Sequence, residues 1–515
     1  MDPSPSTAEI GFQSVSATRR LLERGSITSV QIVETLLRRI AEADHEGPEL
    51  HAVLATCPDG IETARRLDAE RRQGKIRGPL HGVAALVKVN IDTAGGEGTT
   101  AGSLALAMTR PTKDAVVVHR LRAAGVIVIA KSNLSEWANF RATHSSSGWS
   151  ATGGQCHNPH ALDRSPGGSS SGSGAGVAAG FAPIAVGTET DGSILCPAAL
   201  NGVVGIKPTV GLTSRTGVVP VSSSQDTVGS MARSVADAAA LLGVLAGGGA
   251  GADPFDPVTV TRPTDLPNDY TAFCDSEGLS GVRVGVPRQH YFGYSAKADA
   301  LVEAALQVAR DAGAVIVDPA EVATAEAISQ SNDEMTVMLH EYKAGVETYL
   351  ATRPRVPGQP RTVSDVVAFN QDHAADELAL FGQDILIAAC EAGGLDSPAY
   401  IEARARNWRR ARRDGIDAAL KSANADVLAF PTMGPAWYID HVNGDSHTRA
   451  GYQAAAVAGY PAISLPVGKA GGLPVALCLV GTAWSEPLLI RAAFALEQAL
   501  ALSSDMRPAW RSRVE

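Results

Sequence analysis

The chain has 515 residues, of which 45% are hydrophobic and 19% charged, and its formal net charge is −10. This balance suits a large buried core, and the negative charge disfavours phosphate backbones and anionic membranes as partners. Aromatic residues, at 5%, are too few for a surface that stacks on nucleic acid bases. The N-terminus lacks the basic and apolar regions of a secretory signal, and no apolar run reaches membrane-spanning length. We therefore expect a cytoplasmic protein that binds neither nucleic acid nor membrane.

Periodicity predicts alternating helices and strands along the chain. Apolar residues at helical spacing predict helices over 14–75, one of them capped near Thr28 or Ser29. The remaining predicted elements are a strand within 82–90, a helix over 115–124, a strand over 126–130, a strand, helix and strand over 282–286, 296–312 and 314–317, and a strand over 427–430. Such alternation is typical of an α/β fold, with a mixed central sheet covered by helices on both faces.

Two glycine-rich segments stand out near the middle of the chain. Residues 165–176 read SPGGSSSGSGAG and residues 187–198 read GTETDGSILCPA, which places Ser169 and Ser193 in turns 24 residues apart. Glycine permits positive φ and lets a ligand approach the main chain, so backbone N–H groups stay available in such turns. A hydroxyl beside free N–H groups is the arrangement that acyl transfer requires.

A third candidate residue, Lys88, lies inside the apolar run GVAALVKVN at 82–90. Taken alone, a lysine in a strand more often reaches solvent at the strand edge. If it is buried instead, desolvation disfavours its charged form, and the neutral amine can accept a proton near pH 7. Lys88 is therefore a candidate base.

Together, Lys88, Ser169 and Ser193 resemble the serine–serine–lysine site of the amidase signature family. Residues 166–176 are similar to the family's PGGSSGGS segment, 187–198 to its GTDTGGSIRxPA segment, and 202–214, GVVGIKPTVGLTS, to its GxxGxKPTxGxxS continuation. The resemblance covers roughly residues 75–250 and 425–500.

The resemblance implies a role for each residue and a hydrolase that cleaves linear amides through an acyl-enzyme. Ser193 would be the nucleophile, Ser169, after a cis peptide bond, the proton relay, and Lys88 the base. The backbone N–H groups of Thr190, Asp191, Gly192 and Ser193 would form the oxyanion hole. This chemistry calls for no metal and no organic cofactor.

Residues 188–199 are most similar to the form carried by peptide amidases, which remove ammonia from C-terminal peptide carboxamides. Three positions depart from the common family pattern: Val89 stands for an aspartate, Asp191 for a glycine and Leu195 for an arginine. The losses of an acid at 89 and a base at 195 are a candidate linked pair, because either charge alone would be unpaired. The expected substrate is a peptide amide or similar small amide, with an aryl acylamide or a carbamate as alternatives.

For domain organisation, we expect residues 1–75 to form an N-terminal helical segment packed on one amidase domain over 76–505. A variable insertion at about 253–425 would shape the substrate pocket. The oligomeric state is expected to be a monomer or a homodimer.

Two other classes of function remain open from the residues alone. Residues 168–172 satisfy the GxSxG pattern, which would make Ser170 the nucleophile of an α/β-hydrolase esterase with His441 or His447. A poor strand precedes that glycine, however. The glycine-rich turns could also belong to a non-catalytic anion-binding module, although no Gly-Lys-Ser/Thr sequence follows them.

Overall fold

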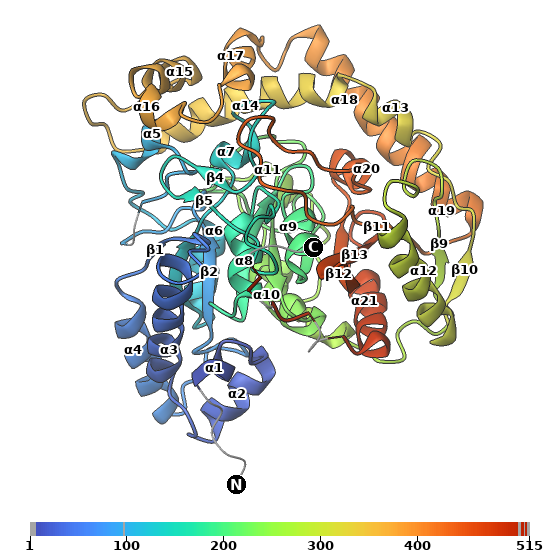
Figure 1. The fold of residues 1–515 in the computed structure, drawn as a ribbon, viewed down its shortest axis with the longest axis horizontal. Coiled ribbons are helices and arrows are strands. Elements are labelled where there is room, and N and C mark those ends of the chain that lie inside the picture. Colours follow the sequence, from blue (N-terminus) through green and yellow to red (C-terminus); the bar gives the residue numbers. More distant parts are fainter. Residues whose placement is uncertain (1–6, 96–97, 503–505, 509, 512–515) are drawn as a thin grey trace.

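The computed structural model describes residues 7–95, 98–502, 506–508 and 510–511 (Figure 1). Within them, eleven strands form one mixed sheet, and β4 (Trp149–Ser150) pairs separately with β5 (Gly154–Gln155). The large sheet has the spatial order β1 (Val53–Thr56), β3 (Ile127–Ser132), β2 (Ala84–Lys88), β6 (Ile184–Glu189), β8 (Thr227–Ala232), β7 (Val204–Lys207), β12 (Ala462–Ala470), β13 (Leu473–Val480), β11 (Val427–Pro431), β9 (Arg283–Gly285) and β10 (Val315–Val317).

Strand directions change along this sheet. Strands β3, β2 and β6 run parallel to one another, and so do β11, β9 and β10. The strands between these two groups pair antiparallel, as does edge strand β1 with β3. The sheet is therefore mixed.

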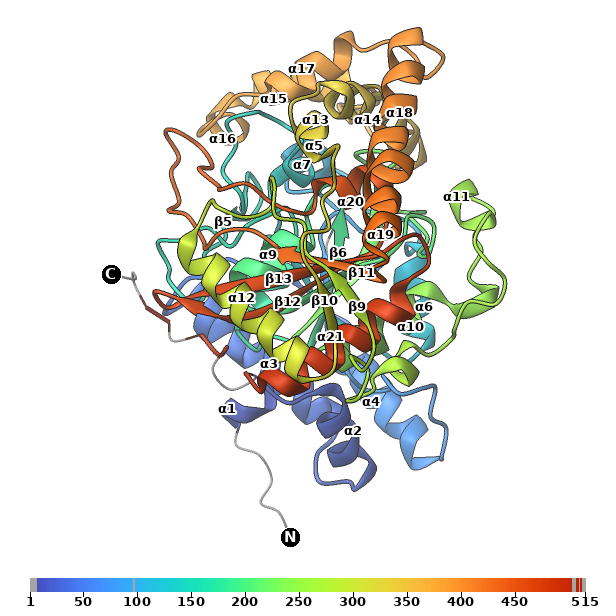
Figure 2. The same cartoon turned by 90° about the vertical axis from the view of Figure 1, so that its right-hand side faces the viewer.

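Helices cover both faces of the sheet, and β2 shows how the sequence achieves this. Ala85 and Val87 belong to an apolar cluster with one helical layer, whereas Ala84 and Leu86 belong to the cluster with the other layer. Side chains alternate between the faces of a strand, so an all-apolar strand can fill two cores. One layer consists of α6 (Val116–Ala123), α10 (Val235–Ala246), α12 (Ala296–Asp311) and α21 (Glu486–Leu500). The other includes α3 (Ser29–Ile40), α4 (Gly60–Arg72), α8 (Ser171–Ala178), α9 (Leu195–Asn201) and α20 (Gln453–Ala458). Figure 2 shows α12 and α21 side by side against β12.

Further helices extend beyond the sheet. An arm at the top of Figure 1 is built around α14 and α18, which pack on each other. The arm comprises α13 (Ala325–Ser329), α14 (Asp333–Thr352), α15 (Val363–Asp372), α16 (Ala374–Glu377), α17 (Asp384–Glu391) and α18 (Pro398–Ala411). The chain then returns to the sheet through a π-helical turn (Arg412–Ile416) and α19 (Asp417–Ala423), which packs beside β9. The remaining helices are α1 (Thr7–Ile10), α2 (Val15–Glu23), a π-helical turn (Ala41–His45), α5 (Leu104–Ala107), α7 (Glu136–Asn139), a 3-10 turn (Gly248–Ala250), α11 (Pro257–Val260) and a 3-10 turn (Tyr270–Phe273).

Helix α8 packs unusually close to its neighbours, and its glycines explain why. A Cβ added at Gly172 would lie 2.0 Å from the Ala52 carbonyl oxygen and 2.6 Å from the Asn133 nitrogen. Side chains there would force the helix away from the adjoining backbone. The glycine-rich sequence therefore places the start of α8, and the serines before it, close to the sheet.

The expected α/β architecture is confirmed, and most predicted elements lie within a few residues of their expected bounds. The capped helix is α3, with Thr28 and Gln31 forming a capping box. One difference is β1 at Val53–Thr56, inside a region predicted to be helical throughout. Two backbone N–H groups here, those of Ala52 and Val53, donate to the Asp44 carboxylate, which fixes the chain beside β3. The proposed division at residue 76 stays a prediction. None of the helices in the described part of the chain is both long and apolar enough to cross a membrane.

Candidate active site

Three segments that carry the predicted residues meet at one edge of the sheet. Strand β2 ends at Lys88 and its parallel neighbour β6 ends at Glu189, so both chains leave the sheet on the same side. The turn at 190–193 follows β6 directly. The segment before α8 joins this turn, since the Ser170 N–H donates to the Ser193 carbonyl oxygen at 3.1 Å. The fold thus brings Lys88, Ser169, Ser170 and Ser193 into one region.

Lys88 is buried completely, and its side chain contacts Ser169. Its Nζ donates to Ser169 Oγ at 2.8 Å, and to Oγ1 and the carbonyl oxygen of Thr188 at 2.9 and 3.3 Å. Burial lowers the pKa of Lys88 to about 7, while the nearby Asp226 and Glu189 carboxylates act in the opposite direction. A large share of Lys88 is therefore neutral near neutral pH and can accept a proton.

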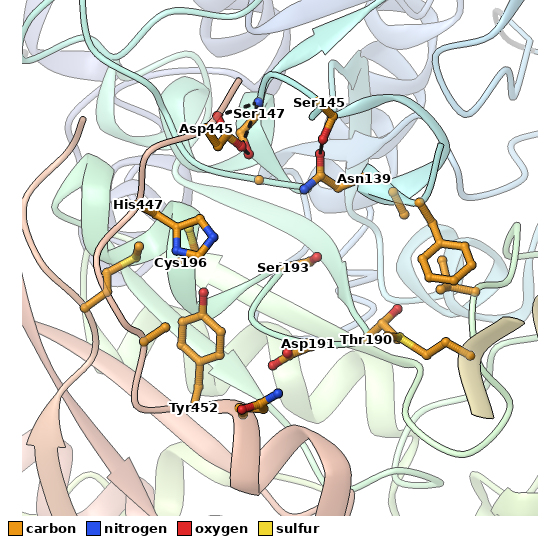
Figure 3. Close-up of a pocket in the computed structure, with 18 of the residues that line it drawn as sticks. Asn139, Ser145, Ser147, Thr190, Asp191, Ser193, Cys196, Asp445, His447 and Tyr452 are labelled. Atoms are coloured by element: carbon orange, nitrogen blue, oxygen red, sulfur yellow. Dashed lines mark hydrogen bonds between the residues drawn. The ribbon is translucent and has the colours of Figure 1, made fainter. Parts of the chain in front are cut away.

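The two candidate serines differ in their access to solvent. Ser169 is fully buried and follows a cis peptide bond from Gly168, whereas Ser193 is 7% exposed. Figure 3 places Ser193 within the cavity, among Thr190, Asp191 and Cys196. Ser193 is thus the one of the two that a substrate in this cavity can reach.

The turn at 190–193 offers backbone donors beside Ser193. Among the described residues, the N–H groups of Asp191 and Ser193 have no hydrogen-bond partner. The pKa of the Glu189 carboxylate is raised, mainly by burial. The nearby Gly192 N–H acts in the opposite direction, because it stabilises the ionised carboxylate. The same carboxylate accepts from the N–H groups of Ile194 and Leu195 at 2.7 and 2.9 Å. The Gly192 N–H thus lies near the Glu189 carboxylate, whereas the N–H groups of Asp191 and Ser193 are available to a substrate oxygen.

A cavity of about 510 Å³ opens beside Ser193. Its walls come from residues between His290 and Ile385 and from two other stretches, 138–147 and 433–453. The lining includes Asn139, Phe140, Ser145, Ser147, Thr190, Asp191, Ser193, Cys196, His290, Met335, Met338, Ile385, Trp437, Asp445, His447, Arg449, Tyr452 and Gln453. Asp445 accepts from the N–H and Oγ of Ser147 and from Trp437 Nε1, so it ties the 433–453 stretch to the opposite wall (Figure 3). Within the described residues, no group of three or more His, Cys, Asp or Glu side chains is arranged to hold a metal ion.

Several residues that organise this site are not among those predicted from the sequence. Thr188 Oγ1 accepts from Lys88 and also from Asn90 Nδ2 at 3.0 Å. Asp226 accepts from Thr190 Oγ1 at 2.6 Å. Thr188 belongs to the motif segment at 187–198, so its contact with Lys88 could have been predicted from the hydroxyl that it adds to this motif. Asp226 lies outside these motifs, and nothing local in its sequence indicates a contact with Thr190.

Ser170 is poorly placed to be a nucleophile. Its side chain is fully buried, its Oγ donates to the Thr188 carbonyl oxygen at 3.0 Å, and it accepts from the Thr188 N–H at 3.2 Å. His441 Nε2 contacts Gln155 Oε1, and His447 Nδ1 contacts the Thr448 carbonyl oxygen. The hydroxyl that the α/β-hydrolase alternative requires as nucleophile is therefore engaged in hydrogen bonds with the backbone of Thr188.

The three departures from the family pattern have different surroundings. Val89 and Leu195 are both fully buried, and Leu195 belongs to an apolar cluster. Asp191 instead lines the cavity, and its Oδ1 has no hydrogen-bond partner among the described residues. Burial and the nearby Glu334 raise the pKa of Asp191 well above its usual range. The substitution of aspartate for glycine thus brings a carboxyl group to the cavity wall.

Comparisons with known proteins agree with this arrangement. The family model described as Amidase matches residues 31–490. A probable amidase from Arabidopsis thaliana is 36% identical over 501 residues, which cover 96% of this chain and 91% of that protein. A glutamyl-tRNA(Gln) amidotransferase subunit of Anaeromyxobacter sp. (strain K) is 38% identical over 502 residues, covering 92% and 94%.

Among solved structures, the native peptide amidase from Stenotrophomonas maltophilia superposes with a TM-score of 0.90 at 49% identity. The match covers 95% of this chain and 97% of that one. The family match spans all eleven strands of the sheet and every residue of the candidate site. The chain therefore belongs to the amidase signature family and is a hydrolase of amide bonds.

Proposed function

We propose that this amidase releases ammonia from the C-terminal carboxamide of short peptides, with Ser193 as nucleophile, Ser169 as proton relay and Lys88 as base. The hydrogen bond of 2.8 Å from the buried Lys88 Nζ to Ser169 Oγ carries the proposal. It connects a lysine with a pKa of about 7 directly to Ser169, without an intervening histidine.

The proposed chemistry has two similar halves. Neutral Lys88 takes a proton from Ser169, which takes one from Ser193 as the Ser193 oxygen attacks the amide carbonyl carbon. The oxyanion accepts hydrogen bonds from the free N–H groups of Asp191 and Ser193, and one such bond is typically worth about 10²–10³ in rate. The proton returns through Ser169 to the leaving nitrogen, ammonia departs, and an acyl ester remains on Ser193. Water then attacks this ester and gives one proton to the same relay. As the bond from the carbonyl carbon to Ser193 Oγ breaks, the relay returns that proton to Ser193 Oγ, and the carboxylic acid departs.

The cavity supports a substrate larger than a simple aliphatic amide. Its volume of about 510 Å³ falls in the usual range of small-molecule sites, which is about 300–1,000 Å³. Apolar surface comes from Phe140, Met335, Met338 and Ile385, while Asn139 adds a polar group that suits a peptide link. The similarity to the Stenotrophomonas peptide amidase, at 49% identity, favours the same substrate class.

An amide panel tests this proposal. Purified enzyme would be given an amidated dipeptide, a free aliphatic amide, an anilide and a carbamate, with ammonia, aniline and alcohol followed separately. We expect the highest kcat/KM for ammonia release from the amidated dipeptide. Turnover confined to the anilide would make the protein an aryl acylamidase, and turnover confined to the carbamate would make it a urethane hydrolase. Either result would overturn the proposed substrate.

A further inference from the structure

Asp226, just before β8, contacts the turn that carries Ser193 from behind. Its Oδ1 accepts from Thr190 Oγ1 at 2.6 Å, and its Oδ2 accepts from the backbone N–H groups of Val221 and Ser222 at 2.8 and 2.9 Å. Thr190 is the first residue after β6 and lies three positions before Ser193. The Asp226 carboxylate therefore anchors the beginning of the nucleophile turn to the loop at 221–226.

The same carboxylate lies on the Lys88 side of the site. Asp226 lines a small cavity together with Asn90, Thr188 and Thr190. It therefore lies near Thr188, whose Oγ1 accepts from both Lys88 and Asn90. Of the acids whose charge favours protonated Lys88, Asp226 acts more strongly than Glu189. The Glu189 carboxylate is occupied by backbone N–H groups of α9.

Arg215 lies near Asp226, but its guanidinium group pairs mainly with Asp256. Arg215 forms a two-pronged ion pair with Asp256, at 3.0 and 2.7 Å, and meets only the carbonyl oxygen of Asp226, at 3.5 Å. Burial raises the pKa of Asp226 to about 6, so its side chain is mostly ionised at pH 7. The negative charge next to the lysine is thus only partly offset by a cation.

We propose that Asp226 is a positioning residue for amide hydrolysis: it fixes the turn that bears Ser193 and supplies negative charge beside Lys88. This inference rests on the proposed function, because it takes Lys88 as the base and Ser193 as the nucleophile. Asp226 itself does not touch the substrate cavity. Its two effects act through different groups, so two kinds of substitution separate them.

Asp226→Asn removes the charge and conserves the shape. With its amide oxygen toward the two backbone N–H groups, the new side chain can donate from its nitrogen to Thr190 Oγ1, so the anchor persists. Loss of the negative charge lowers the pKa of Lys88. Because neutral Lys88 is the active form, the acid limb of the kcat/KM profile moves to lower pH, by about one pH unit. A residue that only supported the fold would lower the rate without moving this limb.

Thr190→Val and Thr190→Ser test the anchor while the charge stays. The valine variant has no hydroxyl to donate to Asp226, so we expect kcat to fall on the order of 10-fold through loss of alignment, with the acid limb unmoved. The serine variant keeps the hydroxyl that donates to Asp226, so it should recover most of the kcat that the valine variant loses. This pair also keeps the inference testable if Asp226→Asn does not fold.

Asp237→Asn is the matched control for removing a buried aspartate. Asp237 also accepts a backbone N–H, that of Val15, at 3.1 Å, and burial likewise raises its pKa to about 6. It lies on α10, away from Lys88, so its variant should keep the wild-type pH profile. Each variant would first be checked by thermal unfolding and then assayed on the amidated dipeptide between pH 5 and 9.

The outcomes distinguish the two proposals. If Lys88→Met retains activity, the proposed mechanism fails, whatever Asp226 does. If that variant is inactive but folded Asp226→Asn keeps the wild-type acid limb, the charge role of Asp226 is wrong. If Thr190→Val is as active as Thr190→Ser, the anchoring role is wrong. The inference stands when Asp226→Asn moves the limb and Thr190→Val lowers kcat alone.

Discussion

Lys88 is partly neutral near pH 7, whereas a lysine side chain in water is almost fully protonated at that pH. Its side chain is fully buried, and its pKa of about 7 lies well below its ordinary value because burial disfavours the charged form. Hydrogen bonds to Ser169 and Thr188 fix its nitrogen without a carboxylate in direct contact. A lysine buried in this way destabilises the folded protein at pH values below the ordinary lysine pKa, which gives a measurable signature.

The stability of a Lys88→Met variant should differ from wild type in a pH-dependent manner. Between pH 7 and 10, Lys88 is neutral when folded and protonated when unfolded, so wild type takes up a proton on unfolding. Its free energy of unfolding should therefore rise with pH relative to the variant, by about 1.4 kcal/mol per pH unit. Urea unfolding of both proteins across this range checks the slope. A constant difference would show that Lys88 keeps its proton in the folded state.

The turn at 190–193, which connects β6 to α9, requires a glycine at position 192. Gly192 has φ of +78°, and a Cβ added there would lie 2.1 Å from a ring carbon of Tyr452. Tyr452 precedes α20 and lines the substrate cavity. The sequence from β6 to α9 therefore turns beneath an aromatic ring with no space for a side chain.

Gly192→Ala should lower kcat/KM on the order of 100-fold, because the turn or the ring must move. Gly281→Ala is a suitable control, since Gly281 has a similar φ of +74° but no atom within 4 Å of the added Cβ. The control bears the backbone strain without the collision, so it should stay fully active. Equal activity of the two variants in the amide assay would show that the close packing on Tyr452 is not needed.

How far the sequence predicts this structure also depends on the element. Strand β2 was predictable from its continuous apolar run, and helix α12 from its apolar residues at helical spacing. Strand β1 was not, since it has only four residues and is fixed by hydrogen bonds to the Asp44 carboxylate and by pairing with β3, which residue propensities do not indicate. The motif serines were found from local pattern. Asp226 and the 433–453 wall were missed because their roles arise from contacts between distant segments.

On the scale of the whole molecule, a buried ion cluster ties the helical arm to the wall of the cavity. Arg141 NH1 donates to Glu136 Oε1 at 2.7 Å, also contacts the Glu377 carbonyl oxygen, and lies 3.7 Å from Glu377 Oε2. The Glu377 carboxylate accepts from Ser103 Oγ and the Leu104 N–H. All three charged side chains are at 0% exposure. Segments far apart in the sequence are thus fixed around Ala138–Phe140, part of the cavity wall.

Arg141→Met should destabilise the folded protein by about 3–5 kcal/mol, since it leaves two buried carboxyl groups without their cation. Arg413→Met is the control, because the ion pair of Arg413 with Asp414 is exposed and such pairs contribute little. Chemical unfolding at pH 7 measures both. A loss no larger for Arg141→Met than for the control would mean that the arm is not held by this cluster.

The central claim is that Ser193, and not Ser170, attacks the amide. The most direct measurement is ammonia release from an amidated dipeptide by wild type, Ser193→Ala and Ser170→Ala, each first shown to be folded. We predict that Ser193→Ala loses activity by at least about 10⁴-fold, since the nucleophile cannot be replaced. Ser170→Ala should retain measurable turnover, because its hydroxyl bonds only to the Thr188 backbone. Activity that survives in Ser193→Ala but is abolished in Ser170→Ala would contradict the account.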